Sequence, residues 1–326
     1  MGPAPAAIAV TGLHKHFGKT HALRGLDLTV PAGTVCGLLG PNGAGKTTAV
    51  RVLATLAAPS AGRALVAGYD VTRDPDEVRR RIGFTGQHAA LDENLTGRQN
   101  LLLLARLHRF GARGARARAD ELLEHFGLAD AAGRLVRAYS GGMRRRLDLV
   151  ASLITRPEVL FLDEPTTGLD PRSRGEIWST VRRLAAEGTT VLLTTQYLDE
   201  ADRLAGEIAV VDHGTVIASA SPERLKETIG VRLEATVADP TRLAAAATVL
   251  ERLADSRAST DEAQCRVTVT AFGGRHVSLP RIVRELDAAG VDAVDVALRR
   301  PSLDEVFLTL TGGLPADTDT TERSAA

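Results

Sequence analysis

Several features that mark common protein classes are absent from the 326 residues of this chain. Only two cysteines occur, Cys36 and Cys265, and they are far apart and lack C-x-x-C spacing, which argues against a disulfide framework and a cysteine metal site. No run approaches the roughly 18 consecutive apolar residues of a membrane span, and residues 1–7 lack the basic start and apolar run of a signal peptide. We expect a cytoplasmic chain. If it works at a membrane, another polypeptide must cross it.

The chain also has no net charge, because Lys+Arg 40 balances Asp+Glu 40. A surface that binds a polyanion usually carries a clear positive excess, so we expect no nucleic-acid partner. The hydrophobic share of 44% and the charged share of 25% are ordinary for a globular protein. The length exceeds what one hydrophobic core usually serves, and this favours two domains.

Short β-rich runs alternate with helical patterns in the first part of the chain, and this alternation predicts an α/β domain over residues 1–225 with a mostly parallel sheet. The pattern becomes mostly helical at about 88–156, which indicates a helical subdomain. Thr96 and Gln99 have the spacing of a capping box before an apolar run.

A different pattern follows residue 225. Strand-like segments at 231–238, 266–270 and 293–298 alternate with helical segments at 241–253, 279–289 and 302–311. They predict a small βαβαβα sandwich, an accessory α/β domain of residues 226–312 without a chemical constellation. Residues 313–326 lack apolar anchors, and we expect a disordered tail.

The segment from residue 40 to residue 47 has the G-x-x-x-x-G-K-T pattern between a predicted strand and a predicted helix, the context that a phosphate-binding loop requires. Glycines let successive backbone N–H groups turn toward phosphate oxygens, a lysine ammonium sits between the phosphates, and a threonine hydroxyl reaches Mg²⁺. The predicted ATP-binding residues are Gly40, Pro41, Asn42, Gly43, Ala44, Gly45, Lys46, Thr47 and Thr48.

An apolar strand at 159–162 runs directly into two carboxylates, Asp163 and Glu164. Such a strand can be buried while its end emerges beside the phosphate loop, so Asp163 is a candidate Mg²⁺ ligand together with Thr47. Glu164 can hold a water for attack on the γ-phosphate and accept its proton, which makes it the candidate general base.

Ser140, Gly141 and Gly142 precede a predicted helix, so that Ser140 can cap it while the two glycine amides remain uncovered for an anion. With this segment upstream of the acidic strand, the chain resembles the ATP-binding subunits of ABC transporters over residues 7–225. The resemblance implies a P-loop NTPase fold with an antiparallel N-terminal β part and a helical insert. It also implies a homodimer, in which the serine-glycine segment of one chain closes on the ATP held by the other.

The resemblance implies further site residues. Phe17 resembles the aromatic residue that stacks on adenine, although a lone phenylalanine is equally well a core residue. Gln87 resembles the glutamine that reaches Mg²⁺ and the attacking water, and Asp170 resembles the aspartate of the loop that crosses the dimer interface. Gln196 stands where the family usually has a histidine; its amide can donate a hydrogen bond but cannot shuttle a proton.

The segments 194–202 and 300–307 resemble the drug-resistance branch typified by daunorubicin exporter ATPases. This implies an ATP-hydrolysing subunit that works with Mg²⁺ at the cytoplasmic face of the membrane and energises export through a separate permease. The exported compound cannot be identified from such a subunit. A soluble ABC ATPase without a transport role and a nucleotide-dependent switch that hydrolyses poorly remain alternatives, the second because of Gln196.

Overall fold

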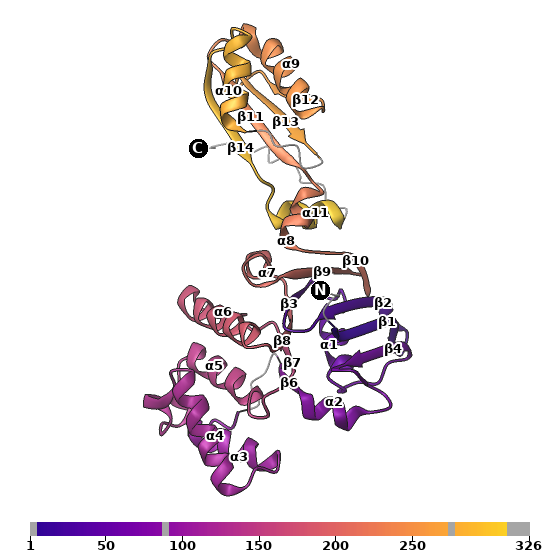
Figure 1. Ribbon diagram of the computed structural model, residues 1–326, viewed down its shortest axis with the longest axis vertical. Helices are drawn as coiled ribbons and strands as arrows, with labels where there is room; N and C mark the ends of the chain where they lie inside the picture. Colours follow the sequence, from indigo (N-terminus) through magenta and orange to yellow (C-terminus); the bar gives the residue numbers. More distant parts are fainter. Residues whose placement is uncertain (1–4, 87–90, 273–277, 312–326) are drawn as a thin grey trace, which may run out of the picture. The chain divides into compact units, whose positions relative to one another are not determined.

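A computed structural model describes residues 5–86, 91–272 and 278–311. The chain forms two compact units, residues 1–220 and residues 221–326 (Figure 1). Within the described ranges, no helix has the length and apolar character needed to cross a membrane.

A six-stranded sheet forms the centre of the first unit, in the order β10-β9-β3-β8-β7-β6. Its strands are β3 (Val35–Leu39), β6 (Ile82–Thr85), β7 (Val159–Asp163), β8 (Thr190–Thr195), β9 (Glu207–Asp212) and β10 (Thr215–Ala220). Neighbouring strands are parallel except for the β9–β10 pair. Every residue of β3, β7 and β8 is buried, as expected for a parallel sheet covered on both faces.

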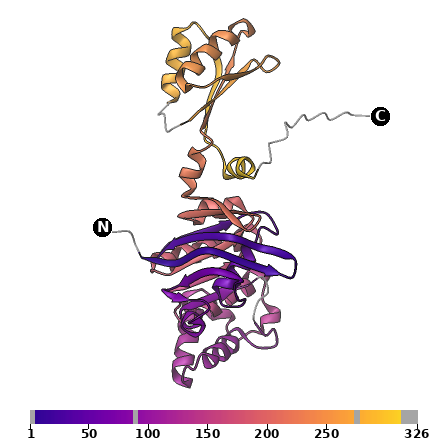
Figure 2. The same cartoon turned by 90° about the vertical axis from the view of Figure 1, so that its right-hand side faces the viewer.

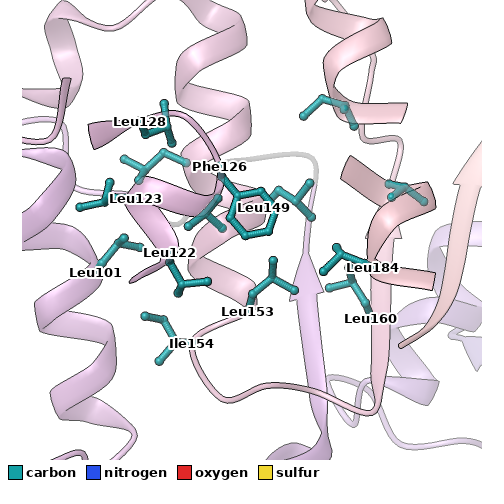
Figure 3. Packing of buried hydrophobic residues seen from close by; sticks show 14 of the residues in the cluster. Leu101, Leu122, Leu123, Phe126, Leu128, Leu149, Leu153, Ile154, Leu160 and Leu184 are labelled. Atoms are coloured by element: carbon teal, nitrogen blue, oxygen red, sulfur yellow. The ribbon is translucent and has the colours of Figure 1, made fainter. Parts of the chain in front are cut away.

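Alternate residues of the central strands enter two separate cores. Leu160 and Leu162 of β7 pack with the helices of one face, and Figure 3 shows Leu160 in this cluster with leucines from the helical subdomain. Val159 and Phe161 belong to the core on the other face, where α1 and a second sheet lie. Because successive side chains of a strand point to opposite faces of the sheet, the helical subdomain packs on one face and the phosphate-loop helix α1 on the other.

The second sheet of this unit has the strand order β2-β1-β4-β5, and its three neighbouring pairs are antiparallel. It consists of β1 (Ala6–Phe17), β2 (Thr20–Pro31), β4 (Ala61–Val66) and β5 (Tyr69–Asp70). The predicted antiparallel N-terminal β part and mostly parallel central sheet are therefore confirmed.

The helices of the first unit are α1 (Lys46–Leu53), α2 (Pro75–Arg81), α3 (Gly97–Leu107), α4 (Ala112–His125), η1 (Ala129–Ala131), η2 (Val136–Ala138), α5 (Gly141–Ser152), α6 (Pro171–Ala186) and α7 (Leu198–Leu204). The predicted capping box is present at α3, where the Thr96 hydroxyl accepts from the Gln99 N–H and the Gln99 side chain accepts from the Thr96 N–H. Helices α3, α4 and α5 form the helical insert between β6 and β7 (Figure 1).

The second unit contains α8 (Pro222–Glu227), β11 (Val231–Val237), η3 (Pro240–Arg242), α9 (Leu243–Ala254), β12 (Ala258–Asp261), β13 (Arg266–Ala271), α10 (Leu279–Ala288), β14 (Ala293–Arg299) and α11 (Leu303–Leu310). The sequence pattern missed β12, so the predicted βαβαβα order was incomplete. The short strand has the sequence ASTD, which is polar and largely exposed and carries no apolar alternation.

With β12 included, the antiparallel sheet has the order β12-β13-β11-β14, which is the split β-α-β arrangement of ferredoxin-like units. Helices α9 and α10 pack against this sheet (Figure 2), and their buried apolar residues, such as Leu250 and Ile282, belong to one core with it. The predicted small α+β unit is confirmed, with one more strand than expected. The tail predicted to be disordered, 313–326, lies outside the described residues.

Candidate active site

The loop between β3 and α1 carries the predicted phosphate-binding residues. Pro41, Asn42 and Gly43 are exposed at its tip, whereas Ala44 is buried. Gly45 has φ 108, and a Cβ there would lie 2.6 Å from the Ala22 carbonyl oxygen of β2. Only glycine fits this turn, both for its conformation and for its contact with β2.

Lys46 begins α1 and is buried. Its ammonium donates to the carbonyl oxygens of Gly40 at 2.7 Å and Pro41 at 3.0 Å, both in the same loop. Burial lowers the pKa of Lys46, and the carboxylates of Glu164 and Asp163 oppose this shift. The loop therefore holds a desolvated cation at its centre, close to two acidic groups.

A chain of hydrogen bonds joins the phosphate loop to the end of β7. The Thr47 hydroxyl donates to Asp163 Oδ1 at 3.0 Å, and the Thr194 hydroxyl donates to the same oxygen at 2.6 Å. The Thr194 hydroxyl in turn accepts from the Glu164 N–H at 3.1 Å. The parallel β3, β7 and β8 end at the same edge of the sheet, which is how Thr47, Asp163, Glu164 and Thr194 come together.

Glu164 is half-buried and has φ 49, in the left-handed region that a residue with a side chain enters at a cost of about 1–3 kcal/mol. Its N–H also donates to the Thr194 carbonyl at 3.2 Å, and its Oε2 accepts from the Thr167 hydroxyl at 3.2 Å. These contacts hold the turn after β7 in a defined conformation with the carboxylate next to the buried strand end.

Three further residues were predicted for this site, and the structure describes two of them, Gln196 and Phe17. Gln196 is half-buried and follows β8 directly, two residues after Thr194. Phe17 is 51% exposed at the end of β1, so it is not a core residue, and the Lys15 ammonium lies 4.8 Å from its ring centroid. Gln87 lies outside the described residues.

The remaining predicted residues form a second cluster at the start of α5 and α6. Ser140 caps α5, its hydroxyl accepting from the Met143 N–H, and Ser140 and Gly141 are exposed. Gly142 is buried and lies close to α6. A Cβ at this position would lie 2.2 Å from the Ser173 hydroxyl oxygen, so there is no room for a side chain. That hydroxyl donates to Asp170 at 2.7 Å, and Asp170 caps α6.

Helices α5 and α6 pack in the core on one face of the central sheet, and α1 packs in the core on the other. The serine-glycine cluster and the phosphate-loop helix therefore belong to opposite faces of the sheet. The structure divides the predicted residues into a phosphate-loop group and a serine-glycine group, in which Ser140 and Gly141 are exposed and Gly142 is buried.

Two polar residues that contact the end of β7, the buried Thr194 and the largely buried Arg145, were missed by reasoning from sequence. Thr194 interrupts an apolar strand, and a polar residue in such a strand requires a partner, so a signal was present. Arg145 is the middle member of three consecutive arginines, and the sequence gives no indication which of them points inward.

The ABC transporter family matches residues 23–167 of the chain. A daunorubicin resistance ATP-binding protein, DrrA3 of Streptomyces coeruleorubidus, is 60% identical over 310 residues, which cover 95% of this chain and 97% of that protein. The daunorubicin/doxorubicin resistance ATP-binding protein DrrA of Streptomyces peucetius is 51% identical over 330 residues, covering 98% and 96%. A dimeric post-hydrolysis structure of an ATP-binding cassette bound to ADP and Pi matches with a TM-score of 0.59 at 26% identity, covering 66% of this chain and 98% of that one.

Proposed function

The chain belongs to the ABC transporter family, in the branch of the daunorubicin and doxorubicin resistance ATP-binding proteins, and from this premise we propose that it hydrolyses ATP to energise export of a drug-like compound through a separate membrane permease. One observation carries the proposal: hydrogen bonds through Thr47, Asp163 and Thr194 join the phosphate loop to the backbone of Glu164. The binding loop and the candidate base are thus parts of one connected site.

In this proposal, ATP binds along the loop from Gly40 to Thr48, with its phosphates facing the backbone N–H groups at the start of α1. Lys46 is desolvated and bonded only to neutral carbonyl oxygens among its described hydrogen-bond partners. A phosphate oxygen is a better acceptor for an ammonium than a peptide carbonyl, because the bond is then charge-assisted on both sides. Lys46 would therefore exchange these carbonyls for the phosphates.

The residues at the base of the loop fit a magnesium ion. The Thr47 hydroxyl and the Asp163 carboxylate lie 3.0 Å apart, and Mg²⁺ prefers such oxygen ligands together with substrate phosphates. We assign Thr47, Asp163 and Gln87 to its site. When bound, Mg²⁺ would reduce the charge repulsion among the phosphates.

Glu164 is the proposed general base: its carboxylate orients the attacking water and accepts its proton. The hydrogen bonds of its N–H to Thr194 fix its position relative to Asp163. Gln196, next to β8, is proposed to donate to the γ-phosphate, and the half-exposed Phe17 ring to stack on adenine.

We further propose that two copies of the chain sandwich ATP. Ser140 and Gly141 are exposed, and α5 packs on the sheet face opposite α1, an arrangement suited to contacting a nucleotide held by another chain. Gly142 and Asp170 would complete this contact from α5 and α6. The dimeric cassette among the structural relatives supports this arrangement.

The proposed place of the dimer is the cytoplasmic face of the membrane, where the helical insert of residues 88–156 would dock on the permease. The cassette would extend over residues 1–225. Residues 226–312 would serve as an accessory domain that supports dimer contacts or regulation.

The test is the Glu164→Gln variant, which keeps the size and polarity of the side chain but removes the base. Co-expressed with its permease, it is expected to abolish drug efflux, and the purified chain is expected to form a stable ATP-bound dimer. Glu158→Gln is the matched control, since Glu158 is an exposed partner of Arg81 immediately before β7. Unchanged efflux in the Glu164→Gln variant would contradict the proposal.

A further inference from the structure

Arg145 lies in the second turn of α5, and its side chain is only 12% exposed. It donates to four backbone carbonyl oxygens: Nη1 to Gly86 at 2.7 Å, Nη2 to Asp163 at 3.2 Å and Glu164 at 3.0 Å, and Nε to Pro165 at 2.9 Å. One guanidinium thus joins α5 to the segment after β6 and to the turn after β7.

The two neighbouring arginines behave differently. Arg144 forms an ion pair with Glu93 at 2.8 Å, and Arg146 forms one with Glu176. Both are side-chain pairs outside the turn after β7. Within this run of three, Arg145 is the residue whose described contacts reach the backbone of the candidate base.

The contact set depends on the shape of the guanidinium. Its five N–H donors lie in one plane, so they can reach carbonyls on several sides at once. A lysine ammonium has three donors on a single atom and cannot span the same carbonyls. The positive charge is balanced by Asp148, whose carboxylate lies 3.5 Å away.

We propose that Arg145 is a positioning residue. It couples helix α5, which begins at the serine-glycine segment, to the turn after β7 that carries Glu164 in the same chain. The inference rests on the proposed function, in which the start of α5 closes on the ATP held by the partner. Closure at that ATP would then set the backbone position of Glu164 in the chain's own site, through the bonds to the Glu164 and Pro165 carbonyls.

The same guanidinium reaches Gly86, the residue immediately before Gln87 in the sequence. Helix α5 therefore cannot shift relative to β6 and β7 without breaking these hydrogen bonds or moving the carbonyls with it. The coupling makes the two ATP sites of a dimer interdependent, because each chain contributes its α5 to one site and its Glu164 to the other.

The experiment compares Arg145→Gln and Arg145→Lys with the control Arg144→Gln in the full chain with its permease. For Arg145→Gln, we expect kcat to fall about 10- to 100-fold through misplacement of Glu164. The Hill coefficient for ATP should fall from about 2 to about 1. Binding of a fluorescent ATP analogue to the isolated chain should change less than about twofold, since the contacts of Lys46 and Thr47 are untouched.

Arg145→Lys should remain impaired despite its charge, and Arg144→Gln should behave as wild type. In Arg145→Ala, millimolar guanidinium should restore part of kcat, which a general loss of stability would not allow.

If the wild type is cooperative and the Arg145→Gln variant is equally fast and equally cooperative, the role proposed for Arg145 is wrong, while the proposed function of the chain stands. A wild type without cooperativity, whose Glu164→Gln variant does not dimerise with ATP, would instead reject the proposed function. Loss of analogue binding in Arg145→Gln without guanidinium rescue would also overturn the role, by showing general damage to the site.

Discussion

Thr194 offers a sharp test of the hydrogen-bond chain in the site. Its side chain is fully buried, and its hydroxyl donates to Asp163 at 2.6 Å while accepting from the Glu164 N–H at 3.1 Å. Thr194→Val keeps the shape of the side chain, so no cavity forms, but it removes both interactions. The backbone carbonyl of Thr194 still accepts from the Glu164 N–H at 3.2 Å, so that donor keeps a partner.

The principal loss is therefore one hydrogen bond to a charged acceptor, about 1.5–3 kcal/mol. Burial of the valine methyl group that replaces the hydroxyl stabilises the fold by less than about 1 kcal/mol. We therefore expect the free energy of unfolding to fall by about 2 kcal/mol. For a unit of this size, that is a drop in Tm of about 4–8 °C. Unfolding of the first unit can be followed by the fluorescence of Trp178, the single tryptophan of the chain.

Activity should fall with the stability, because the Glu164 backbone loses a fixed contact. We expect kcat to drop about tenfold, the equivalent of about 1.4 kcal/mol in the activation barrier. ATP binding should be nearly unchanged. Thr194→Ser, which keeps the hydroxyl, is the control and should retain kcat. The reasoning is refuted if the valine variant is as stable and active as wild type, or if the serine variant loses as much activity as the valine variant.

Three further predictions follow from single contacts. Gly142→Ala should lower ATPase activity at least about tenfold, because its Cβ would lie 2.2 Å from the Ser173 hydroxyl oxygen. Adding Ser173→Gly should recover part of the loss, and a double variant no better than the single one would contradict the packing explanation. Hydrogen bonds from Ser173 lower the pKa of Asp170, so its stabilisation of α6 is complete above the pKa of the unfolded carboxyl, about 3.9, and disappears as pH falls through the lower folded value. In denaturation measured over this pH range, the stability difference between wild type and Asp170→Asn should shrink on acidification, and a constant difference would argue against it. Burial raises the pKa of the Cys36 thiol from an ordinary 9.0 to about 12, which lowers its thiolate fraction about a thousandfold. Iodoacetamide should therefore modify only the half-buried Cys265 in the folded chain, as mass spectrometry can check, and rapid labelling of Cys36 would contradict its burial.

The sequence predicted most of the elements because their patterns are local. The buried strands β3, β7 and β8 each contain a run of three or more buried residues that are mostly apolar, and the capping box of α3 is visible in two residues, Thr96 and Gln99. Strand β12 was missed because it is short, polar and exposed, so that its pairing with β13 decides its structure.

The chemical identities of the candidate site are also local. The residues from Gly40 to Thr48, the pair Asp163 and Glu164, and the cap at Ser140 are contiguous motifs, so they are visible without a fold. Their site roles remain predictions, and Gln87 lies outside the described residues.

The contacts between these motifs depend on tertiary structure. Thr194 is 31 residues from Asp163 in the sequence, and their hydrogen bond forms because β8 pairs with β7. Arg145 is one of three adjacent arginines with the same local signal, and only the packing of α5 on the sheet turns it toward the Glu164 carbonyl. The sequence by itself therefore determined which groups the chain contains and which local conformation holds each motif. The tertiary structure decided which groups touch, because distant strands and helices are brought together by burial of their apolar faces.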